Sequence, residues 1–312
     1  MRDTVVEQMR DIVDRYMHHP KLNELVLECV QEKIGEQKVW SEHVLNCHFF
    51  LGGSSPYIER LAANLELIVL AGDILDDLQD QDHQQKVWLQ APPALALNAA
   101  VAMLTAAFGD ISTLSAQHSE LAENRVVEQV SRLLALSLNG QHGDLCNDME
   151  SEQGYLSMAA EKSGSLIRLA FMLGYAPLRQ PDRTTIERLD QIAVNIGVMA
   201  QLENDLRDVL SFDEKNDLLG RKRTLPIQYL LRYSEEDLPL FKQYFEGAAT
   251  RETFLESRTE TLEFVRQSGC VEYTRAVQML LFNETEELFM SIPGDPHWKS
   301  KFREDAFARF GR

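Results

Sequence analysis

Four aspartates occur within a short segment of the sequence at the spacing of one helical face. The last three follow the first by three, four and seven residues, and the set is Asp73, Asp76, Asp77 and Asp80. In a helix these carboxylates project from the same side and repel one another. The apolar neighbours Ile74 and Leu75 imply that the helix is half-buried, which raises the cost of this repulsion, so we expect a bound cation to offset it. Carboxylate oxygens suit Mg²⁺, whereas a solvated acidic surface is the simpler alternative for this segment alone.

A second segment repeats this geometry further along the chain. Asn204, Asp205 and Asp208 lie on one face of a predicted helix that also carries apolar residues, among them Ile196, Val198, Met199 and Leu202. An amide oxygen also coordinates Mg²⁺, so Asn204 is acceptable in place of a carboxylate. Two such helices that face each other across a cavity would hold several metal ions. The alternative is an exposed acidic turn, which the presence of the first segment makes less attractive.

Two short segments offer groups that bind phosphate. Lys162 and Ser163 lie between the two acidic helices, and Lys222 and Thr224 follow the second one. Lysine binds phosphate strongly as a point charge. A solvated surface position is the usual explanation for a single lysine, but the placement of both beside the acidic segments favours a diphosphate site.

The elements that carry these residues have helical periodicity. Apolar residues recur at steps of three and four in residues 61–72, 127–138 and 186–196, and we find no alternating strand pattern closed by Asn-Gly or Asp-Gly turns. Glycine and proline breaks at residues 52–56, 91–93, 174–181 and 292–294 separate helices of ordinary length. The sequence therefore predicts an all-α fold.

Composition limits the organisation and the partners of the chain. No linker-like stretch divides the 312 residues, so we expect one domain over residues 1–312. The 49 acidic and 31 basic residues give a formal net charge of -18, which would repel nucleic acid. The four cysteines lack the spacing of a zinc site or a disulfide framework, and the N-terminal segment lacks the apolar region of a signal peptide. These features predict a cytoplasmic protein.

One nearly uncharged segment, Ala91 to Gly109, approaches the length of a membrane span. Its prolines, its many alanines and Asn98 make it a poor helix for contact with lipid. We therefore expect a buried central helix of a bundle and no membrane span.

The order of these motifs resembles that of the trans-prenyltransferase, or polyprenyl diphosphate synthase, family. Asp76-Asp77-Leu78-Gln79-Asp80 matches the first of the family's two Asp-rich motifs. The other matches, in the family's order, are Glu66-Leu67-Ile68, Gly140-Gln141 with Asp144-Leu145, Tyr155, Lys162-Ser163, Gln201, Asn204-Asp205-x-x-Asp208, Asp217-Leu218 and Lys222-x-Thr224-Leu225-Pro226. The resemblance covers roughly residues 60 to 230. It implies a helical bundle of the isoprenoid-synthase type around a central cavity, a Mg²⁺-dependent prenyltransferase activity and a homodimer.

Departures from the family pattern concern the second substrate. Family members that elongate chains hold isopentenyl diphosphate with a Gly-Gly-Lys-x-x-Arg segment and an arginine pair after the first motif. Here Gly52-Gly53 is followed by Ser54-Ser55-Pro56, and the arginine pair is replaced by Gln85-Lys86. Lys33 and Lys38 are the candidate replacements for the missing cations.

Within the family, the chain is most similar to the ComQ branch, whose members attach a geranyl or farnesyl group to a tryptophan of a peptide pheromone used in quorum sensing. The resembling segments are GDILDDLQDQDHQQKVW, Leu97 to Ala100 and Gly140 to His142. A neutral indole carries no diphosphate, so such an acceptor would not need the missing cations. The second Asp-rich motif is fuller than this branch implies, which keeps a chain-elongating synthase as an alternative.

The resemblance also implies roles for individual residues. We predict that Asp76, Asp80, Asn204 and Asp208 ligate Mg²⁺ directly, and that Asp77 and Asp205 support them. Lys162 and Lys222 would bind the diphosphate of an allylic substrate, and the amide dipole of Gln201 would stabilise the allylic cation. The remaining substrate-binding candidates are Lys86, Gln141, Ser163 and Thr224, with Ala71 and Gly72 at the floor of the prenyl pocket.

Three other functions were weighed. A terpene cyclase would have a third metal ligand eight residues after Asn204, where this chain has Phe212. A di-iron bundle needs Glu-x-x-His pairs, which the sequence lacks. A non-catalytic helical binding protein would leave the acidic motifs without a stabilising cation. Prenyl length and acceptor are left open by the sequence.

Overall fold

The computed structural model describes residues 1–35, 40–80, 85–179, 182–211 and 217–311. These residues form helices and connecting turns, and no strand occurs among them. A helix boundary lies at each of the four predicted breaks, because helices end at Phe50, Gln90, Tyr175 and Met290 and the next ones begin at Ile58, Pro93, Arg183 and Pro296. The predicted all-α fold is confirmed.

The chain divides into two compact units. The first unit comprises Met1–Leu134, Leu166–Asp190 and Ile292–Ala308, and the second comprises Ala135–Ser165, Gln191–Ser291 and the C-terminal residues from Arg309. The one-domain organisation stays a prediction, and each unit is described by itself.

The first unit contains the N-terminal helices and the first Asp-rich motif. Its complete helices are α1 (Asp3–Tyr16), α2 (Pro20–Ile34), α3 (Ser41–Phe50), α4 (Ile58–Asp80), α5 (Val87–Gln90), α6 (Pro93–Gln117), α7 (Ser119–Glu123) and α17 (Pro296–Ala306). It also holds the N-terminal parts of α8 (Val126–Cys146) and α11 (Arg183–Val209), and nearly all of α10 (Ser165–Tyr175).

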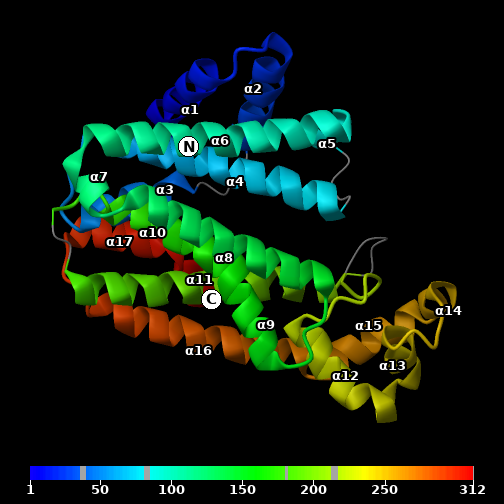
Figure 1. The fold of residues 1–312 in the computed structure, drawn as a ribbon. Coiled ribbons are helices and arrows are strands. Elements are labelled where there is room, and N and C mark those ends of the chain that lie inside the picture. The colour runs from blue at the N-terminus through cyan, green and yellow to red at the C-terminus, as the bar shows by residue number, and fades with distance from the viewer. Residues whose placement is uncertain (36–39, 81–84, 180–181, 212–216, 312) are drawn as a thin grey trace. The chain divides into compact units, whose positions relative to one another are not determined.

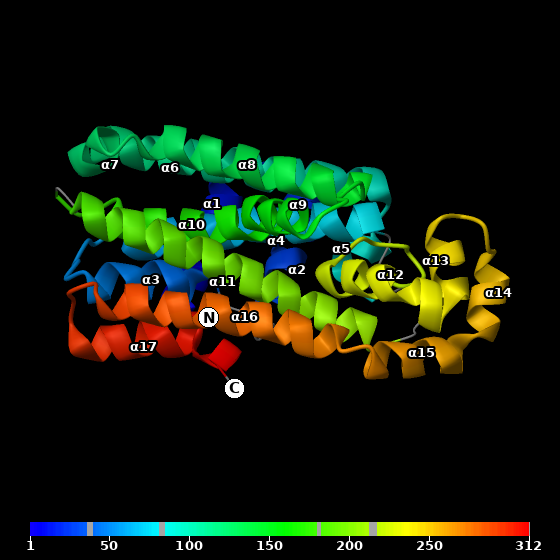
Figure 2. The ribbon, with the colours of Figure 1, turned by 90° about the horizontal axis from the view of Figure 1, so that it is seen from below.

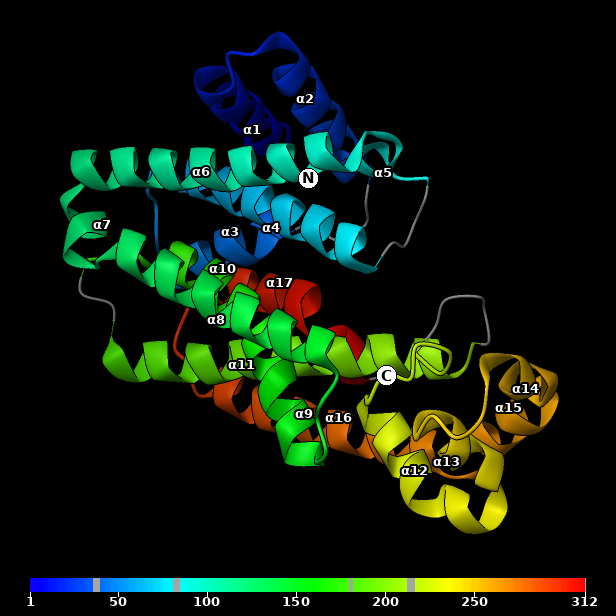
Figure 3. The same cartoon turned by 45° about the vertical axis from the view of Figure 1, so that its right-hand side comes forward.

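Helix α4 lies at the centre of the first unit. It packs against α1, α2, α3 and α6, and Figures 1 and 3 show α4 running beside α6 beneath the α1–α2 hairpin. All residues from Leu61 to Ala71 are buried, so the segment has no solvent-facing side. The first Asp-rich motif follows this buried segment, where the helix becomes half-exposed. The packing of this buried segment therefore fixes the position of the end of α4 that carries the motif.

Charged groups join α4 to its neighbours inside this core. The Arg60 guanidinium donates to both carboxylate oxygens of the buried Asp110 on α6, at 2.8 and 2.6 Å. Asn64 donates to the same carboxylate at 2.8 Å. A bidentate pair supported by a further donor satisfies a buried carboxylate, so the position of α4 against α6 is defined by geometry as well as by apolar contact.

The first residue of helix α3, Ser41, is hydrogen-bonded to a side chain of α4. The buried Glu66 carboxylate accepts a hydrogen bond from the backbone amide of Ser41 at 2.6 Å. Burial raises the pKa of Glu66. A carboxylate at a helix N-terminus satisfies a backbone donor that has no partner within the helix.

The apolar segment predicted to be a buried central helix forms only part of α6, and it is buried on one face. Its inward residues include Ala96, Ala100 and Met103, whereas Leu97 and Val101 are 50% and 51% exposed. The central position belongs to α4, because neighbours surround α4 on more sides. Among the described helices, α6 is the one whose length and composition would let it cross a membrane, and 44% of its most apolar stretch is buried. A core helix meets the same criteria.

The second unit contains the second Asp-rich motif. Its helices are the C-terminal parts of α8 and α11, with α9 (Glu152–Ala159), the π-helical turn η1 (Ala160–Gly164), α12 (Leu225–Asp237), α13 (Pro239–Phe245), α14 (Arg251–Glu256), α15 (Arg258–Gln267), α16 (Cys270–Met290) and most of η2 (Ala308–Gly311). Figure 2 shows α12 to α15 gathered at one end of α16. An aromatic core holds this group together, with Tyr244 and Phe254 stacked at 4.1 Å between ring centroids.

Two glycines allow η1 to cross α11 at close range. A Cβ atom on Gly197 would overlap with the backbone of Gly164. A Cβ atom on Gly164 would lie 3.1 Å from the Cα of Val194. Because the two backbones touch, the turn that carries Lys162 is fixed against the helix that carries the second Asp-rich motif.

Two glycine-to-alanine changes, one at this crossing and one on α4, should have opposite effects on the free energy of unfolding. Gly197→Ala should destabilise the protein by about 1–3 kcal/mol, because the added methyl group overpacks the crossing. Gly72→Ala should stabilise it by up to about 1 kcal/mol, because alanine is the better helix former; an added Cβ at Gly72 meets no atom within 4 Å. Urea unfolding followed by circular dichroism measures both changes, and equal shifts in the two midpoints would contradict the prediction.

Candidate functional site

The first Asp-rich motif lies at the C-terminal end of α4. Asp73, Asp76 and Asp77 are half-buried there. Asp80 is the last residue of the helix, and its side chain lies outside the described part of the chain. The predicted helical face is therefore present, and the surroundings of its first three carboxylates can be described.

The carboxylate of Asp73 is paired with a buried lysine. The Nζ atom of Lys33 on α2 lies 2.6 Å from an Asp73 oxygen, and Lys33 is 3% exposed. Lys33 was one of two candidate replacements for the missing substrate cations, and it is already engaged with α4. The other candidate, Lys38, lies outside the described residues.

The carboxylate of Asp77 accepts a hydrogen bond from a buried tryptophan. The indole Nε1 of Trp88 on α5 donates to Asp77 Oδ2 at 2.8 Å, and Trp88 is 1% exposed. Lys86, a predicted substrate-binding residue, lies over the Trp88 ring at 5.2 Å from its centroid. The Lys86 ammonium is also 3.6 Å from a carboxylate oxygen of Glu32.

The two predicted pocket-floor residues face different surroundings. Ala71 is fully buried in the core of the first unit. Gly72, one helical turn before Asp76, is exposed and has open space around it. Gly72 is thus the position where a larger side chain would enter the space beside the motif.

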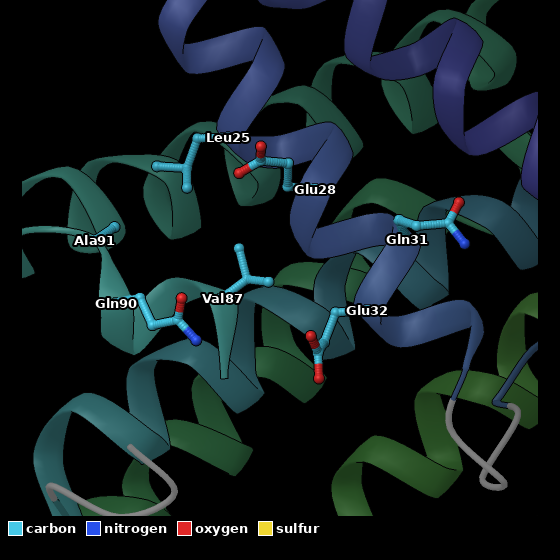
Figure 4. Close-up of a pocket in the computed structure, with 7 residues that line it drawn as sticks. All are labelled: Leu25, Glu28, Gln31, Glu32, Val87, Gln90 and Ala91. Atoms are coloured by element: carbon cyan, nitrogen blue, oxygen red, sulfur yellow. The ribbon is translucent and has the colours of Figure 1, made fainter. Parts of the chain in front are cut away.

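A pocket of about 680 Å³ opens between α2 and α5 in the first unit. Figure 4 shows Val87 on α5 projecting toward Leu25 and Glu28 on α2. The complete lining is Leu25, Glu28, Gln31, Glu32, Val87, Gln90 and Ala91. None of the site residues predicted from the sequence lines it.

The second Asp-rich motif lies near the end of α11, in the second unit. Asp205 is 2% exposed, and both of its oxygens accept hydrogen bonds. The Tyr155 hydroxyl donates to one oxygen, and Gln201 donates to the other at 3.0 Å. Burial raises the pKa of Asp205 well above its usual range, and the nearby charge of Asp217 adds to the shift. Asp205 therefore acts as a fixed internal anchor of the motif.

The neighbouring motif residues are more accessible. Asn204 and Asp208 are half-buried. The Asn204 side-chain oxygen accepts a hydrogen bond from Arg207 at 3.1 Å. Gln201 also accepts a hydrogen bond from the Ser163 hydroxyl at 3.2 Å. The Ser163, Gln201 and Asp205 side chains thus form a hydrogen-bonded chain from η1 to α11.

The two predicted diphosphate-binding lysines meet at one carboxylate. Asp144 on α8 is 8% exposed, and its Oδ2 atom lies 2.6 Å from Lys162 Nζ and 3.8 Å from Lys222 Nζ. The structure therefore brings Lys162 and Lys222 together, as the phosphate-binding prediction requires. Asp144 holds both ammonium groups in place.

The backbone of Lys162 is positioned by its π-helical turn. Such turns leave carbonyl groups displaced from regular helical bonding and often occur at functional sites. The Ser137 hydroxyl donates to the Lys162 carbonyl at 2.8 Å. A Cβ atom at Gly140 would overlap with the Lys162 backbone, so α8 approaches this turn closely only because residue 140 is glycine. Gln141, a predicted substrate-binding residue, is half-buried on α8 beside this contact.

Lys222 lies in a short segment that Asn147 clamps from both sides. The Asn147 side chain donates to the Arg221 carbonyl at 2.8 Å and accepts from the Arg223 amide at 2.7 Å. Asn147 and Arg221 both have positive φ angles, of 53° each, a conformation that asparagine tolerates better than most residues. The clamp explains how a segment between two helices presents Lys222 in a defined position.

The environment of Lys222 fits an anionic ligand accompanied by a hard cation. Burial, together with the nearby charge of Asp208, raises the pKa of Asp217 to about 7, although Lys222 acts to lower it. Four carboxylates, Asp144, Asp205, Asp208 and Asp217, accompany the two ammonium groups. A divalent cation would favour the ionised form of such carboxylates. The buried hydroxyl of Thr224 has no hydrogen-bond partner among the described residues, which fits a position that contacts a ligand.

The donor set alone does not form a complete metal cage. Among the residues that the structure describes, no three His, Cys, Asp or Glu side chains are grouped to hold an ion. Oxygen ligands from few side chains are typical of Mg²⁺, which keeps several waters and binds substrate phosphates. Phe212, the position relevant to a cyclase, lies outside the described residues.

Several site residues had no role assigned from the sequence. Asp144, Tyr155 and Asp217 belong to the segments that carry the family resemblance, so their positions were visible while their contacts were not. Asn147 and Trp88 gave a weaker signal in the sequence. Asn147 directly follows α8, and Trp88 is the last residue of the segment GDILDDLQDQDHQQKVW. Their roles depend on contacts with residues distant in the chain.

Comparison with known proteins assigns the chain to a family. The Polyprenyl synthetase family model matches residues 42–260. The tryptophan prenyltransferase ComQ of Bacillus subtilis subsp. natto is 29% identical over 301 residues, which are 95% of this chain and 90% of that protein.

Solved structures show the same fold. A decaprenyl diphosphate synthase from Rhodobacter capsulatus has a TM-score of 0.83 at 18% identity, covering 97% of this chain and 93% of its own. The geranylgeranyl pyrophosphate synthase from Corynebacterium glutamicum, solved with calcium and isoprenyl diphosphate, has a TM-score of 0.76 at 20% identity, covering 99% and 96%. The chain therefore belongs to the polyprenyl synthetase family and is a prenyltransferase with the class I isoprenoid synthase fold.

Proposed function

We propose that this enzyme transfers a geranyl or farnesyl group from an allylic diphosphate to a tryptophan of a peptide pheromone precursor. The observation that carries the proposal is the similarity to ComQ along 95% of the chain, which includes the segments outside the Asp-rich motifs. The farnesyl diphosphate synthase of Escherichia coli matches only 52% of the chain, at 28% identity. Similarity over the whole length favours the ComQ reaction above chain elongation.

The charges around the first motif support a neutral acceptor. A second diphosphate would need its own cations. Lys33 is paired with Asp73, and Lys86 is paired with Glu32 and lies over Trp88. An indole needs no such cation, so these pairs are compatible with a tryptophan acceptor.

We propose that Mg²⁺ is held by Asp76, Asp80, Asn204 and Asp208. An ion held by these residues would supply positive charge against the negative charge of the leaving diphosphate. Asp77 and Asp205 orient the two motifs, because both carboxylates accept hydrogen bonds from buried side chains. In the second motif, this division of roles matches the burial of the side chains: Asp205 is 2% exposed, whereas Asn204 and Asp208 are half-buried.

The phosphate-binding groups surround Asp144. Lys162 and Lys222 bind the diphosphate with the Thr224 hydroxyl, and Asp144 holds the two ammonium groups in the geometry that receives it. Ser163, Gln141 and Lys86 stay as further substrate-binding candidates. The amide of Gln201 is held at both ends, by Ser163 and Asp205, so its dipole keeps one orientation as the allylic cation forms. The indole carbon then attacks, and its proton passes to the departing diphosphate.

We also propose that the enzyme is a homodimer through the exposed face of α6. Leu97 and Val101 are exposed on this face, and the half-buried Leu104 and Phe108 continue it at alternating steps of three and four residues. This spacing forms a continuous apolar stripe along a helix, as in helices that pair with another helix. A second copy of the chain would cover the stripe by symmetry.

Mass spectrometry tests the proposed reaction directly. The protein is mixed with geranyl or farnesyl diphosphate, magnesium chloride and a tryptophan-containing peptide. We expect one prenyl group on the peptide, loss of product with EDTA, and none on the same peptide with alanine in place of tryptophan. Longer diphosphates formed from added isopentenyl diphosphate would instead identify an elongating synthase. No magnesium-dependent diphosphate release from any allylic substrate would identify a non-catalytic protein.

Substitution of Lys162 or Lys222 should lower the activity far more than substitution of an exposed lysine. Lys162→Met and Lys222→Met should each lower kcat about 100- to 1000-fold, as loss of one stabilising donor does in other enzymes. Lys21→Met, at an exposed position on α2, is the matched control and should keep full activity. Steady-state diphosphate release measures the effect, and wild-type rates in both site variants would contradict the assignment.

A size series at Gly72 tests the pocket floor. Gly72→Ser should keep the preference of the wild type, whereas Gly72→Phe should favour the shorter allylic diphosphate, because its ring fills the open space beside Asp76. The measured quantity is the ratio of kcat/KM for geranyl and farnesyl diphosphate. Circular dichroism checks the fold, and an unchanged ratio in a folded Gly72→Phe variant would place the prenyl chain elsewhere.

Substitution of the α6 stripe tests the dimer. Val101→Glu should shift the protein to a monomer in analytical ultracentrifugation, because a carboxylate cannot be buried without a partner. Leu280→Glu on α16 is the matched control, since Leu280 is 70% exposed but lies outside the stripe. A wild-type monomer at micromolar concentration, or a dimer unaffected by Val101→Glu, would contradict this interface.

A further inference from the structure

Trp88 differs from the other tryptophans in what its polar atom contacts. It is 1% exposed, and its indole N–H donates to Asp77 within the first Asp-rich motif. The indole nitrogen is a donor only, and an oxygen of the Asp77 carboxyl group accepts its hydrogen bond. The hydrogen bond therefore favours one orientation of the Asp77 side chain.

The ring of Trp88 is held in turn by the start of α5 and by α2. The Lys86 ammonium lies over the ring at 5.2 Å, and Glu32 on α2 pairs with that ammonium at 3.6 Å. Val87, the next residue, contributes to the wall of the pocket between α2 and α5 (Figure 4). The indole is thus enclosed on several sides, and it cannot turn away from Asp77 without moving α5.

The second motif has a matching arrangement. Asp205 occupies the position after Asn204 as Asp77 occupies the position after Asp76, and it accepts a hydrogen bond from the buried Tyr155. In both units, the second residue of the motif is bound by a buried aromatic donor. The residue before it, Asp76 or Asn204, is half-buried.

We propose that Trp88 is a positioning residue of the prenyltransferase, which holds Asp77 so that the neighbouring Asp76 presents its carboxylate for metal binding. The indole N–H fixes the rotamer of Asp77 and with it the last turn of α4. Outer partners of metal sites orient the ligands in this way, and their loss commonly costs ten- to a hundredfold in metal affinity or activity. The proposal rests on the proposed function only for the metal at Asp76.

Nuclear magnetic resonance tests the contact without reference to activity. The three indole N–H signals are assigned with Trp40→Phe, Trp88→Phe and Trp298→Phe variants of the full chain. Asp77→Asn should move the Trp88 signal and leave the Trp298 signal in place. If the Trp88 signal does not move in the Asp77→Asn variant, the proposal is overturned.

Calorimetry then tests the consequence for the metal. Magnesium is titrated in the presence of inorganic diphosphate, and Trp88→Phe should weaken the apparent magnesium affinity about tenfold or more. Trp298→Phe is the matched control, because Trp298 also has a lysine over its ring, Lys301 at 5.4 Å, and packs on Phe49. Equal affinities in the two variants would make Trp88 a packing residue and overturn the proposal.

An isosteric amino acid separates the hydrogen bond from the packing. In a Trp40→Phe, Trp298→Phe protein, Trp88 is replaced by benzothienylalanine, which keeps the two rings and lacks the N–H group. Positioning by the hydrogen bond predicts a normal unfolding midpoint, weakened magnesium affinity and a lower kcat with little change in the peptide KM. Unchanged magnesium affinity would overturn the proposal. If the wild type binds magnesium with diphosphate but transfers no prenyl group, the proposed function fails while this inference stands.

Discussion

Carboxylates in a helical interior need a partner of opposite charge or a strong donor, and this requirement shapes both units of the enzyme. In the first unit, Asp110 is paired with Arg60 and Asp73 with Lys33. In the second unit, Asp144 binds two lysines and Asp205 binds Tyr155. Each buried or half-buried acid in this set has a defined partner, so the charges also specify how the helices pack.

The same requirement separates structural acids from acids that can take part in chemistry. Asp77 and Asp205 already accept hydrogen bonds from buried side chains, and the residues before them, Asp76 and Asn204, are half-buried. A motif of adjacent polar residues thus serves two purposes at once. The second residue of each pair anchors the helix end, and the proposed metal ligand is the residue before it.

Much of this could be predicted from the sequence, because periodicity and breaks are local properties. The helix boundaries near Pro93 and Pro296 and the two acidic helices follow from residue type and order, and the placement of Lys162 and Lys222 beside those helices predicts that both bind one ligand. The burial of α6 was mispredicted, since apolar composition does not reveal which faces have neighbours. The clamp of Asn147 on residues 221–223 and the hydrogen bond of Trp88 were not predictable, because both join residues that only the tertiary fold brings together.

The π-helical turn at Ala160–Gly164 divides one helical run into two registers. Each residue of a regular helix adds about 100° of rotation, so one extra residue in a turn re-aims everything on one side of it relative to the other. The faces that α9 and α10 bury are therefore set independently, even though the chain runs without interruption from one to the other. Deletion of one residue here would leave the segment helical but would rotate Tyr155 relative to Phe171. Both side chains are fully buried in the native fold, and after the rotation only one of them could stay buried.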